Sequence, residues 1–225
     1  MCALAKSARP GSRGEPEKTR AAILNSALEE FAHEGVAGAR TDEIARRAGV
    51  NKALLYYYFK DKEGLYAAAL EQVFKGLHEH VMPVLEDQSL APKVKVLKYV
   101  AAHFDYIASS PMYPRIVQRE FMRSSGKTLS PVGSRILERF GKPIYVKLAA
   151  LIRAGVEQGD FRDVEPLQTL TSILGTIIFY FISLPAQQIM TPGDPSSPER
   201  IAARRTAVQD FVAAALFSRG KELQP

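Results

Sequence analysis

The chain has 225 residues, 46% of them hydrophobic, which is enough for a small module joined to a larger one with its own core. Its formal net charge of +6 permits an anionic partner but does not indicate one, because residues 1–62 and the remainder each carry +3. The single cysteine, Cys2, excludes an internal disulfide and fits a reducing compartment, so we expect a cytoplasmic protein.

The N-terminal residues have no apolar stretch of the length that a signal peptide needs. We expect residues 1–16 to form a flexible basic arm, in which Arg9 and Arg13 either contact DNA or stay solvated. We expect residues 219–225 to form a short tail. Between Glu17 and His33 the apolar residues recur every three or four positions, which predicts an amphipathic helix that ends at Gly35.

Two short helices joined by a tight turn are predicted next, within Thr41–Leu65. The hydroxyl of Thr41 is expected to cap the first of them, and Gly49 to break it. Asn51 then caps a helix that runs to about Tyr58. Small residues at the turn suit two helices that cross at a steep angle.

The rest of the chain also shows helical periodicity, and no strand alternation longer than a few residues is found. Helices are predicted from Asp61 to Pro83, over residues 92–109, 115–123 and 132–158 (divided or kinked near Gly141 and Pro143), and over 167–184 and 199–218. We therefore expect an all-α protein, with an N-terminal helix-turn-helix domain at 17–62 and a larger helical domain at 63–218.

The helix at 167–184 is apolar on nearly every side, and the surrounding residues 166–193 contain no Asp, Glu, Lys or Arg. Such a helix is buried on more than one side. A membrane span is the alternative, but the strongly apolar part is shorter than the roughly 20 residues that a bilayer requires. The sequence favours a core or protein–protein helix over a membrane-associated one.

The helix beginning after Asn51 carries side chains suited to the major groove of DNA. Lys52 can donate to guanine, Asn51 can pair with adenine, and Ala53 can touch a thymine methyl. Tyr57 is expected on the same outer face. Thr41, Tyr56 and Lys62 are suited to phosphate contacts, while Leu55 and Phe59 should point inward. The alternative is a plain helical bundle in which the tyrosines line the edge of a core.

The span from about Thr19 to Leu70 resembles the DNA-binding domain of the TetR/AcrR family of bacterial transcriptional repressors. The matching residues are Ile23, Ala27, Phe31, Gly35, Thr41, Ile44, Ala45, Ala48, Gly49, Val50, Tyr56, Tyr58, Phe59, Lys62, Glu63 and Leu65. Two positions differ from the common pattern: Asn51 stands where Ser is frequent, and Ala53-Leu54 where Gly-Thr or Pro-Thr is frequent. Both differences leave the operator sequence open.

The resemblance implies a homodimer that binds a palindromic double-stranded operator and is released by a small-molecule inducer. Family members dimerise through their last two helices, which predicts an interface at Ile173, Ile177, Tyr180, Leu184, Val208 and Val212. Their middle helices enclose the inducer, which predicts a lining of Phe74, Leu77, His103, Phe104, Tyr106, Ile107, Met112, Tyr113, Phe121, Met122, Ile144, Leu148 and Phe179. Such a lining suggests an apolar or aromatic molecule, although most of these residue types are more often ordinary core.

The sequence does not favour an enzyme. His78 and His80 are two residues apart on a predicted helix and face different directions, so they make a poor metal pair. No phosphate-binding glycine loop or nucleophile elbow is found, so we expect no catalytic residue, metal or cofactor. The alternatives to a ligand-responsive regulator are a non-regulatory all-α interaction protein and a membrane-associated helical protein.

Overall fold

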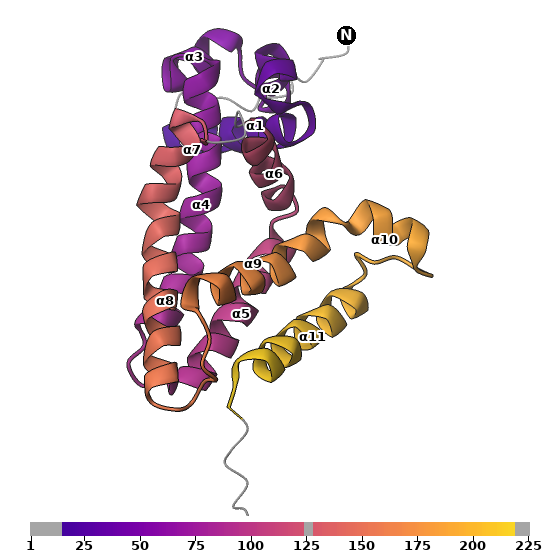
Figure 1. The fold of residues 1–225 in the computed structure, drawn as a ribbon. Helices are drawn as coiled ribbons and strands as arrows, with labels where there is room; N and C mark the ends of the chain where they lie inside the picture. The colour runs from indigo at the N-terminus through magenta and orange to yellow at the C-terminus, as the bar shows by residue number, and fades with distance from the viewer. Residues whose placement is uncertain (1–14, 124–127, 219–225) are drawn as a thin grey trace, which may run out of the picture. The chain divides into compact units, whose positions relative to one another are not determined.

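The computed structural model describes residues 15–123 and 128–218, so the expected N-terminal arm up to residue 14 and the tail at 219–225 lie outside the described residues. The prediction of an all-α protein is confirmed. The helices are α1 (Pro16–Gly38), α2 (Thr41–Arg47), α3 (Lys52–Phe59), α4 (Lys62–Glu86), α5 (Pro92–Ser109), α6 (Tyr113–Arg123), α7 (Pro131–Ile136), the π-helix η1 (Leu137–Gly141), α8 (Lys142–Glu157), α9 (Pro166–Ile182), α10 (Leu184–Met190) and α11 (Pro198–Leu216) (Figure 1).

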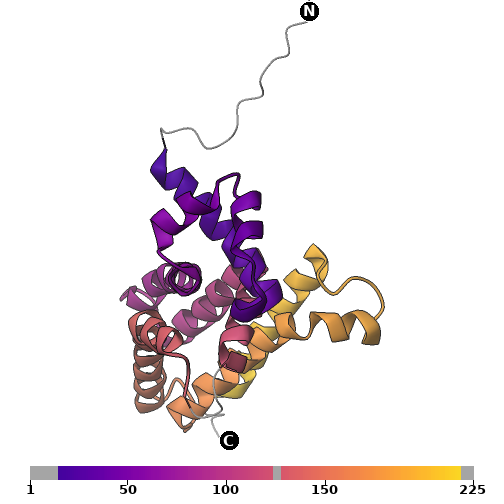
Figure 2. The same ribbon diagram turned by 90° about the horizontal axis from the view of Figure 1, so that it is seen from above.

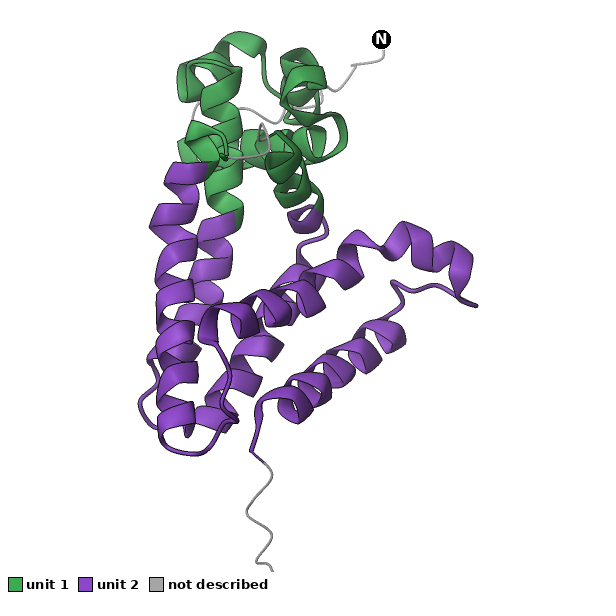
Figure 3. Ribbon diagram, viewed as in Figure 1, with its two compact units in different colours: residues 1–73, 115–133 green, residues 74–114, 134–225 purple. Residues whose placement is uncertain are grey.

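The chain divides into two compact units (Figure 3). Unit 1 contains residues 1–73 and 115–133, and unit 2 contains residues 74–114 and 134–225. Both α4 and α6 therefore begin in one unit and end in the other. The functional division at residues 62 and 63 stays a prediction.

Unit 1 is built around the apolar face of α1, which packs against α2. Ile23 and Phe31 on α1 are fully buried, as is Ile44 on α2. The ring of Phe31 meets Tyr66 of α4 edge to face, with centroids 5.2 Å apart. Gly35 has a φ of 67°, which interrupts the helical conformation of α1 where the sequence predicts its end.

Unit 2 is formed by α5, α8, α9 and α11, which pack against one another. The short helix α10 follows α9, and the chain then returns along α11, as both views show (Figures 1 and 2). Phe104 of α5 packs against Phe181 of α9, with ring centroids 5.0 Å apart. Phe161 and Phe217 pair in an isolated antiparallel bridge, and their rings stack.

Three details differ from the predicted elements. The prediction that α4 stops at Pro83 is wrong: the helix continues to Glu86, because Pro83 lies in its last turn and on an exposed side, where water can satisfy the unpaired carbonyl of Glu79. The predicted division near Gly141 is a π-helical turn, η1, that ends directly before the helix containing Pro143. Helix α10 was not predicted.

In the part of the chain that the structure describes, no single helix is long and apolar enough to cross a membrane. Among the described helices, α9 and α10 taken together are the one pair that meets that criterion, and they are bent by 66° at the break between them.

Candidate nucleic-acid interface

Helix α3 has one exposed and one buried face. Leu55 and Phe59 point inward as predicted and are 0% and 6% exposed. The predicted base-contacting residues are all exposed: Asn51, Lys52, Ala53 and Tyr57. A helix whose apolar residues anchor it on one side and whose polar residues face outward at its N-terminal end suits the major groove.

The turn between α2 and α3 has the hydrogen bonds of a Schellman motif. The N–H of Val50 donates to Ala45 O at 3.0 Å, and that of Gly49 donates to Arg46 O at 3.2 Å. Gly49 has a φ of 68°, a conformation that glycine adopts without strain. Asn51 then caps α3, because its Oδ1 accepts from Leu54 N at 2.8 Å. The predicted break and cap are thus confirmed.

Lys52 is paired within unit 1. Its Nζ lies 2.9 Å from Asp42 Oδ1 on α2, and this hydrogen bond raises the pKa of Lys52 above its ordinary value. Both side chains are substantially exposed, so the pair contributes little to stability and can open when an anion approaches. Lys52 is therefore charged and can be released to a base edge.

The prediction that Thr41 caps α2 is wrong. Thr41 is the first helical residue, Arg40 occupies the cap position, and no side chain of the cap residue bonds the helix. Instead Glu30 of α1 accepts from Arg40 N at 3.1 Å, so the acceptor comes from a neighbouring helix. Thr41 is 8% exposed, and its hydroxyl lies 3.2 Å from the Tyr56 hydroxyl, which brings two of the predicted phosphate contacts together.

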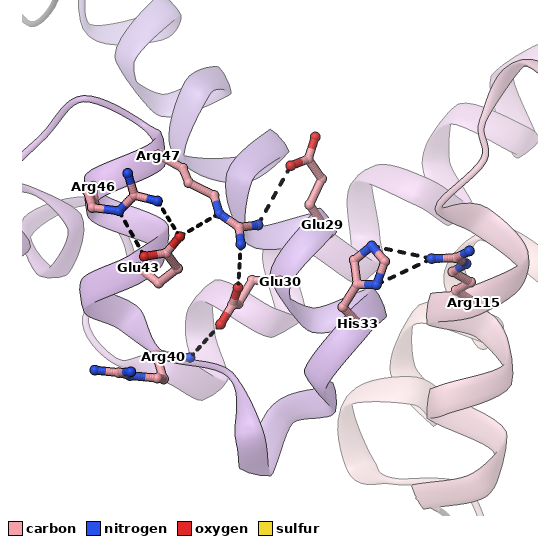
Figure 4. Close-up of polar contacts among 8 residues, drawn as sticks. All are labelled: Glu29, Glu30, His33, Arg40, Glu43, Arg46, Arg47 and Arg115. Atoms are coloured by element: carbon pink, nitrogen blue, oxygen red, sulfur yellow. Dashed lines mark hydrogen bonds and ion pairs between the residues drawn. The ribbon is translucent and has the colours of Figure 1, made fainter.

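Glu30 belongs to a cluster of charges that joins α1 to α2 (Figure 4). Arg47 reaches three carboxylates: Glu43 at 2.8 Å, Glu30 at 3.5 Å and Glu29 at 3.9 Å. Hydrogen bonds from Arg46 and Arg47 lower the pKa of Glu43 to about 2. Glu30 is only 4% exposed and was not among the predicted site residues. Its signal was a charged residue within the apolar stripe of α1.

The position of Lys62 is set by contacts at the corner between α3 and α4. Asp61 Oδ1 accepts from Gly64 N at 2.7 Å, which caps α4 where the sequence predicts its start. Lys62 Nζ donates to Ala37 O at 3.0 Å and so stays near the end of α1. Lys60, also missed by the sequence analysis, has a φ of 62° at this corner and is exposed. A Cβ on Gly64 would meet Phe59 O at 2.5 Å, so the corner needs glycine there.

Helix α6 is fastened to the helices of unit 1. Arg115 Nη1 lies 3.3 Å from each ring nitrogen of His33, and Arg119 donates to His33 O (Figure 4 shows the first contact). Tyr66 donates to Glu120 at 2.7 Å, and Arg123 pairs with Glu63 at 3.0 Å. These contacts hold α6 against both α1 and the start of α4.

The residues predicted to line an inducer pocket fall into three groups. Phe74, Leu77, His103, Phe104, Ile107, Tyr113, Ile144 and Leu148 are buried, and Met112 and Tyr106 are partly buried. The placement of Phe121, Met122 and Phe179 in an enclosed pocket is wrong for the single chain, because they are 51%, 79% and 68% exposed. Phe121 and Met122 also belong to unit 1, on α6.

The residues predicted for a dimer interface are mostly turned inward. Ile173, Ile177, Tyr180, Val208 and Val212 are at most 9% exposed in the single chain, and Leu184 is intermediate. Buried side chains cannot form the surface of an interface, so the selection is corrected. The large exposed apolar residues of α9 to α11 are Leu167, Phe179, Ile189, Met190 and Phe211.

The two histidines of α4 contact different neighbours. His78 Nδ1 lies 3.0 Å from Phe140 O, whereas the ring of His80 lies beside Tyr106 with centroids 5.8 Å apart. Residues 15–123 and 128–218 contain no group of three or more His, Cys, Asp or Glu that could hold a metal ion.

A capped α3 with an exposed polar face, held by buried anchors after a tight turn, defines a helix-turn-helix DNA-binding protein. Comparisons with known proteins agree with this class. Residues 23–69 match the family described as "Bacterial regulatory proteins, tetR family", and residues 92–212 match "Tetracyclin repressor-like, C-terminal domain". The chain belongs to the TetR family of bacterial transcriptional regulators.

Curated relatives and a solved structure resemble most of the chain. The HTH-type transcriptional repressor SCO4008 of Streptomyces coelicolor is 31% identical over 80% of this chain and 86% of its own length. The HTH-type transcriptional repressor NicS of Pseudomonas putida is 29% identical over 66% of this chain and 68% of its own length. The crystal structure of the putative regulator SCO4942 from S. coelicolor covers 87% of this chain and 97% of that one, with a TM-score of 0.67 and 25% identity.

Proposed function

We propose that the protein is a repressor that binds a palindromic operator as a homodimer and leaves it when a small, largely apolar or aromatic inducer binds. The observation that carries DNA binding is α3, whose outer face exposes Asn51, Lys52 and Tyr57 while Leu55 and Phe59 fasten its inner face. A helix anchored in this way enters the major groove with its N-terminal residues at the base edges.

Base contact and phosphate contact are assigned to different residues. Asn51, Lys52, Ala53 and Tyr57 face outward and are proposed to contact bases. Thr41 and Lys62 are the first residues of α2 and α4, and the hydroxyl of Tyr56 lies beside that of Thr41. These three residues are proposed to bind the DNA backbone. Phosphate contacts fix the position of the protein on the duplex, while base contacts choose the sequence.

Replacing Lys52 with alanine is expected to reduce discrimination between operator and random duplex by roughly 10- to 100-fold, because a base-reading side chain is worth about 1–3 kcal/mol. Lys62→Ala should weaken binding to both duplexes alike and lower the slope of affinity against salt by about 1. Fluorescence anisotropy with both duplexes measures these effects. If Lys52→Ala left the preference intact, α3 would not be reading bases through Lys52.

Selection of bound DNA from a random pool tests the proposal as a whole. A recovered palindrome, with half-site centres about one helical turn apart, is expected for a dimer. A non-regulatory helical protein would recover no common sequence, and that result would contradict the proposal.

Dimerisation is proposed through the exposed side of α9 and α11. Phe179 on α9 is 68% exposed and Phe211 on α11 is 59% exposed, which is unusual for side chains of this size. An open hollow next to Phe211 is lined by Thr169, Ser172 and Thr176 of α9, and by Val212 and Ala215 of α11. A second copy of this face would cover both aromatic rings.

The double variant Phe179→Asp and Phe211→Asp is expected to raise the dimer dissociation constant by at least ~30-fold, which corresponds to the ~2 kcal/mol of an interface hot spot. Analytical ultracentrifugation over a concentration series measures it. Val146→Asp is the control, because Val146 is 58% exposed but lies on α8. An unchanged dimer in the double variant would place the interface elsewhere.

Release by an inducer requires that a change in unit 2 alters the helix-turn-helix. Helix α4 begins at Lys62 beside the proposed DNA contacts and continues through Phe74 and Leu77 in unit 2. Helix α6 begins at Tyr113 in unit 2 and carries Arg115 and Arg119, which bind the end of α1. We propose that ligand binding favours a conformer in which these two helices hold the recognition helices at the wrong spacing.

A further inference from the structure

His103 on α5 is a buried histidine with only one of its ring nitrogens satisfied. The residue is 2% exposed, and its Nδ1 lies 3.0 Å from the hydroxyl of Tyr99, one helical turn away. Its Nε2 is buried and has no hydrogen-bond partner. An unpaired buried polar atom costs the free energy of its desolvation, so such an atom calls for a specific explanation.

The contact with Tyr99 determines what His103 Nε2 offers. A phenol is more acidic than the N–H of a neutral imidazole, so the Tyr99 hydroxyl is the natural donor and Nδ1 the acceptor. The proton of the neutral ring then resides on Nε2. The unsatisfied atom is therefore an N–H donor that needs an oxygen or nitrogen acceptor.

A lone water molecule is a poor acceptor for this site. Buried waters usually make about three hydrogen bonds to polar groups that would otherwise be unsatisfied. Within the described ranges, His103 Nε2 and Arg204 Nε are the only buried side-chain nitrogen or oxygen atoms without a partner, and Arg204 lies on α11, where its guanidinium stacks on Tyr180. A water at His103 would satisfy a single unpaired side-chain atom, whereas a ligand also brings apolar surface that packs against the neighbouring rings.

The surroundings of His103 within unit 2 are aromatic. Its ring packs edge to face with Tyr99, with centroids 5.6 Å apart. Tyr113 lies close enough to Tyr99 to help raise the pKa of Tyr99. The ring of Tyr113 also packs against those of Tyr106 and Phe74, with ring centroids 5.7 Å and 6.2 Å apart. Gly76 of α4 lets the Tyr106 hydroxyl approach, since a Cβ there would lie 2.3 Å from it. Ring faces and edges of this kind favour a flat, conjugated partner.

The charge of the site selects further among ligands. Burial lowers the pKa of His103 to about 4, so the imidazole is neutral at pH 7. A carboxylate placed beside it would be a buried charge that the neutral imidazole does not offset, which is costly. A neutral carbonyl accepts the same hydrogen bond without that cost.

We propose that the Nε2–H of His103 donates to the carbonyl oxygen of a neutral aromatic small molecule that binds among Tyr99, Tyr113 and the neighbouring rings of unit 2. This inference deepens the proposed function, because it rests on that function in treating the bound molecule as the inducer. The site itself does not depend on DNA binding. Neutral aromatic ketones, amides and lactones are the ligand class, and carboxylates and plain hydrocarbons are disfavoured.

The test uses the full chain with ¹⁵N-labelled histidine and a matched panel of probes. Acetophenone and benzamide carry the neutral carbonyl, benzoate carries a charge, and α-methylstyrene replaces the carbonyl oxygen of acetophenone with a methylene group. The His103 nitrogen resonances are assigned by their loss in His103→Gln. We expect a protonated Nε2 that shifts with the carbonyl probes, and roughly tenfold tighter binding of acetophenone than of α-methylstyrene.

Variants locate the preference at His103. His103→Phe fills the space without a donor and should remove the preference for acetophenone, and Tyr99→Phe should reduce it by freeing the tautomer. His33→Phe, at an exposed position on α1 in unit 1, should leave it unchanged. Equal binding of acetophenone and α-methylstyrene, tighter binding of benzoate, or carbonyl probes that leave the His103 resonances unmoved would each overturn the inference.

Operator binding measured on the same samples separates this inference from the proposed function. A protein that selects a palindrome but shows none of the His103 shifts would keep its regulatory function and lose this ligand site. A protein that binds the carbonyl probes through His103 but selects no DNA would keep the ligand site and lose the proposed function. Release of the operator by the carbonyl probes and not by α-methylstyrene is the expected result for both.

Discussion

Replacing Glu30 with alanine is expected to lower the free energy of unfolding by about 2 kcal/mol. Glu30 is 4% exposed, accepts from Arg40 N at 3.1 Å and lies 3.5 Å from Arg47. Its loss leaves the N–H before α2 without an acceptor and removes one carboxylate from Arg47. Urea unfolding followed by far-ultraviolet circular dichroism measures the change.

Two further variants separate the causes. Glu29 is one position away and 58% exposed, with its carboxylate 3.9 Å from Arg47, so Glu29→Ala should change the free energy of unfolding by less than ~0.5 kcal/mol. Glu30→Gln retains an acceptor for Arg40 N and should recover part of the loss. Equal effects of Glu29→Ala and Glu30→Ala would show that the buried contact with Arg40 N does not stabilise the turn.

Acid should destabilise the protein through His103 by about 3 kcal/mol, because one pKa unit corresponds to 1.36 kcal/mol. The pKa of His103 is about 4 in the folded protein and 6.5 in an unfolded chain. Between these values the unfolded chain binds a proton that the folded protein does not. The contribution of His103 to the free energy of unfolding is therefore fully retained above pH 6.5, and it falls as the pH drops from 6.5 to about 4.

The contribution of His103 can be isolated from that of the carboxylates. His103→Gln cannot titrate, so the difference in free energy of unfolding between wild type and this variant should change with pH across that window and be constant outside it. Any effect of the substitution on packing is independent of pH, so it adds a constant to the difference in free energy of unfolding and does not change its dependence on pH. Parallel curves for His103→Gln would mean that His103 titrates normally.

Local signals in the sequence were sufficient for the helix-turn-helix. The break at Gly49, the cap at Asn51 and the inward Leu55 and Phe59 each depend on interactions within a few residues. The position of Glu30 in the apolar stripe of α1 marks it as unusual, but its role cannot be found in this way, because its partner Arg40 N lies ten residues away and depends on how α1 packs on α2. The prediction that Thr41 caps α2 was wrong for the same reason, since the acceptor at the start of α2 comes from Glu30 of α1.

The surface of α9 was unpredictable for a different reason. A helix that is apolar on nearly every side has no periodicity to distinguish the core-facing side from the outer one. The residues selected for the dimer, such as Ile173 and Ile177, are on the buried side, and Phe179 is on the exposed side. The orphaned Nε2 of His103 was also beyond the sequence, since it depends on what its neighbours fail to supply.

The cap on α3 has a consequence for operator choice. Asn51 uses its carboxamide oxygen to hold Leu54 N, which leaves the amino group as its outward edge. Lys52 beside it is also a pure donor. Two adjacent donors match the acceptor-rich edges of guanine, and the N7 of adenine or O4 of thymine satisfies only one of them. Serine, frequent at this position in the family, can form the same cap with a hydroxyl. Exchange of asparagine for serine at position 51 can therefore change the operator sequence that the protein recognises, while the N-terminal cap of α3 is retained.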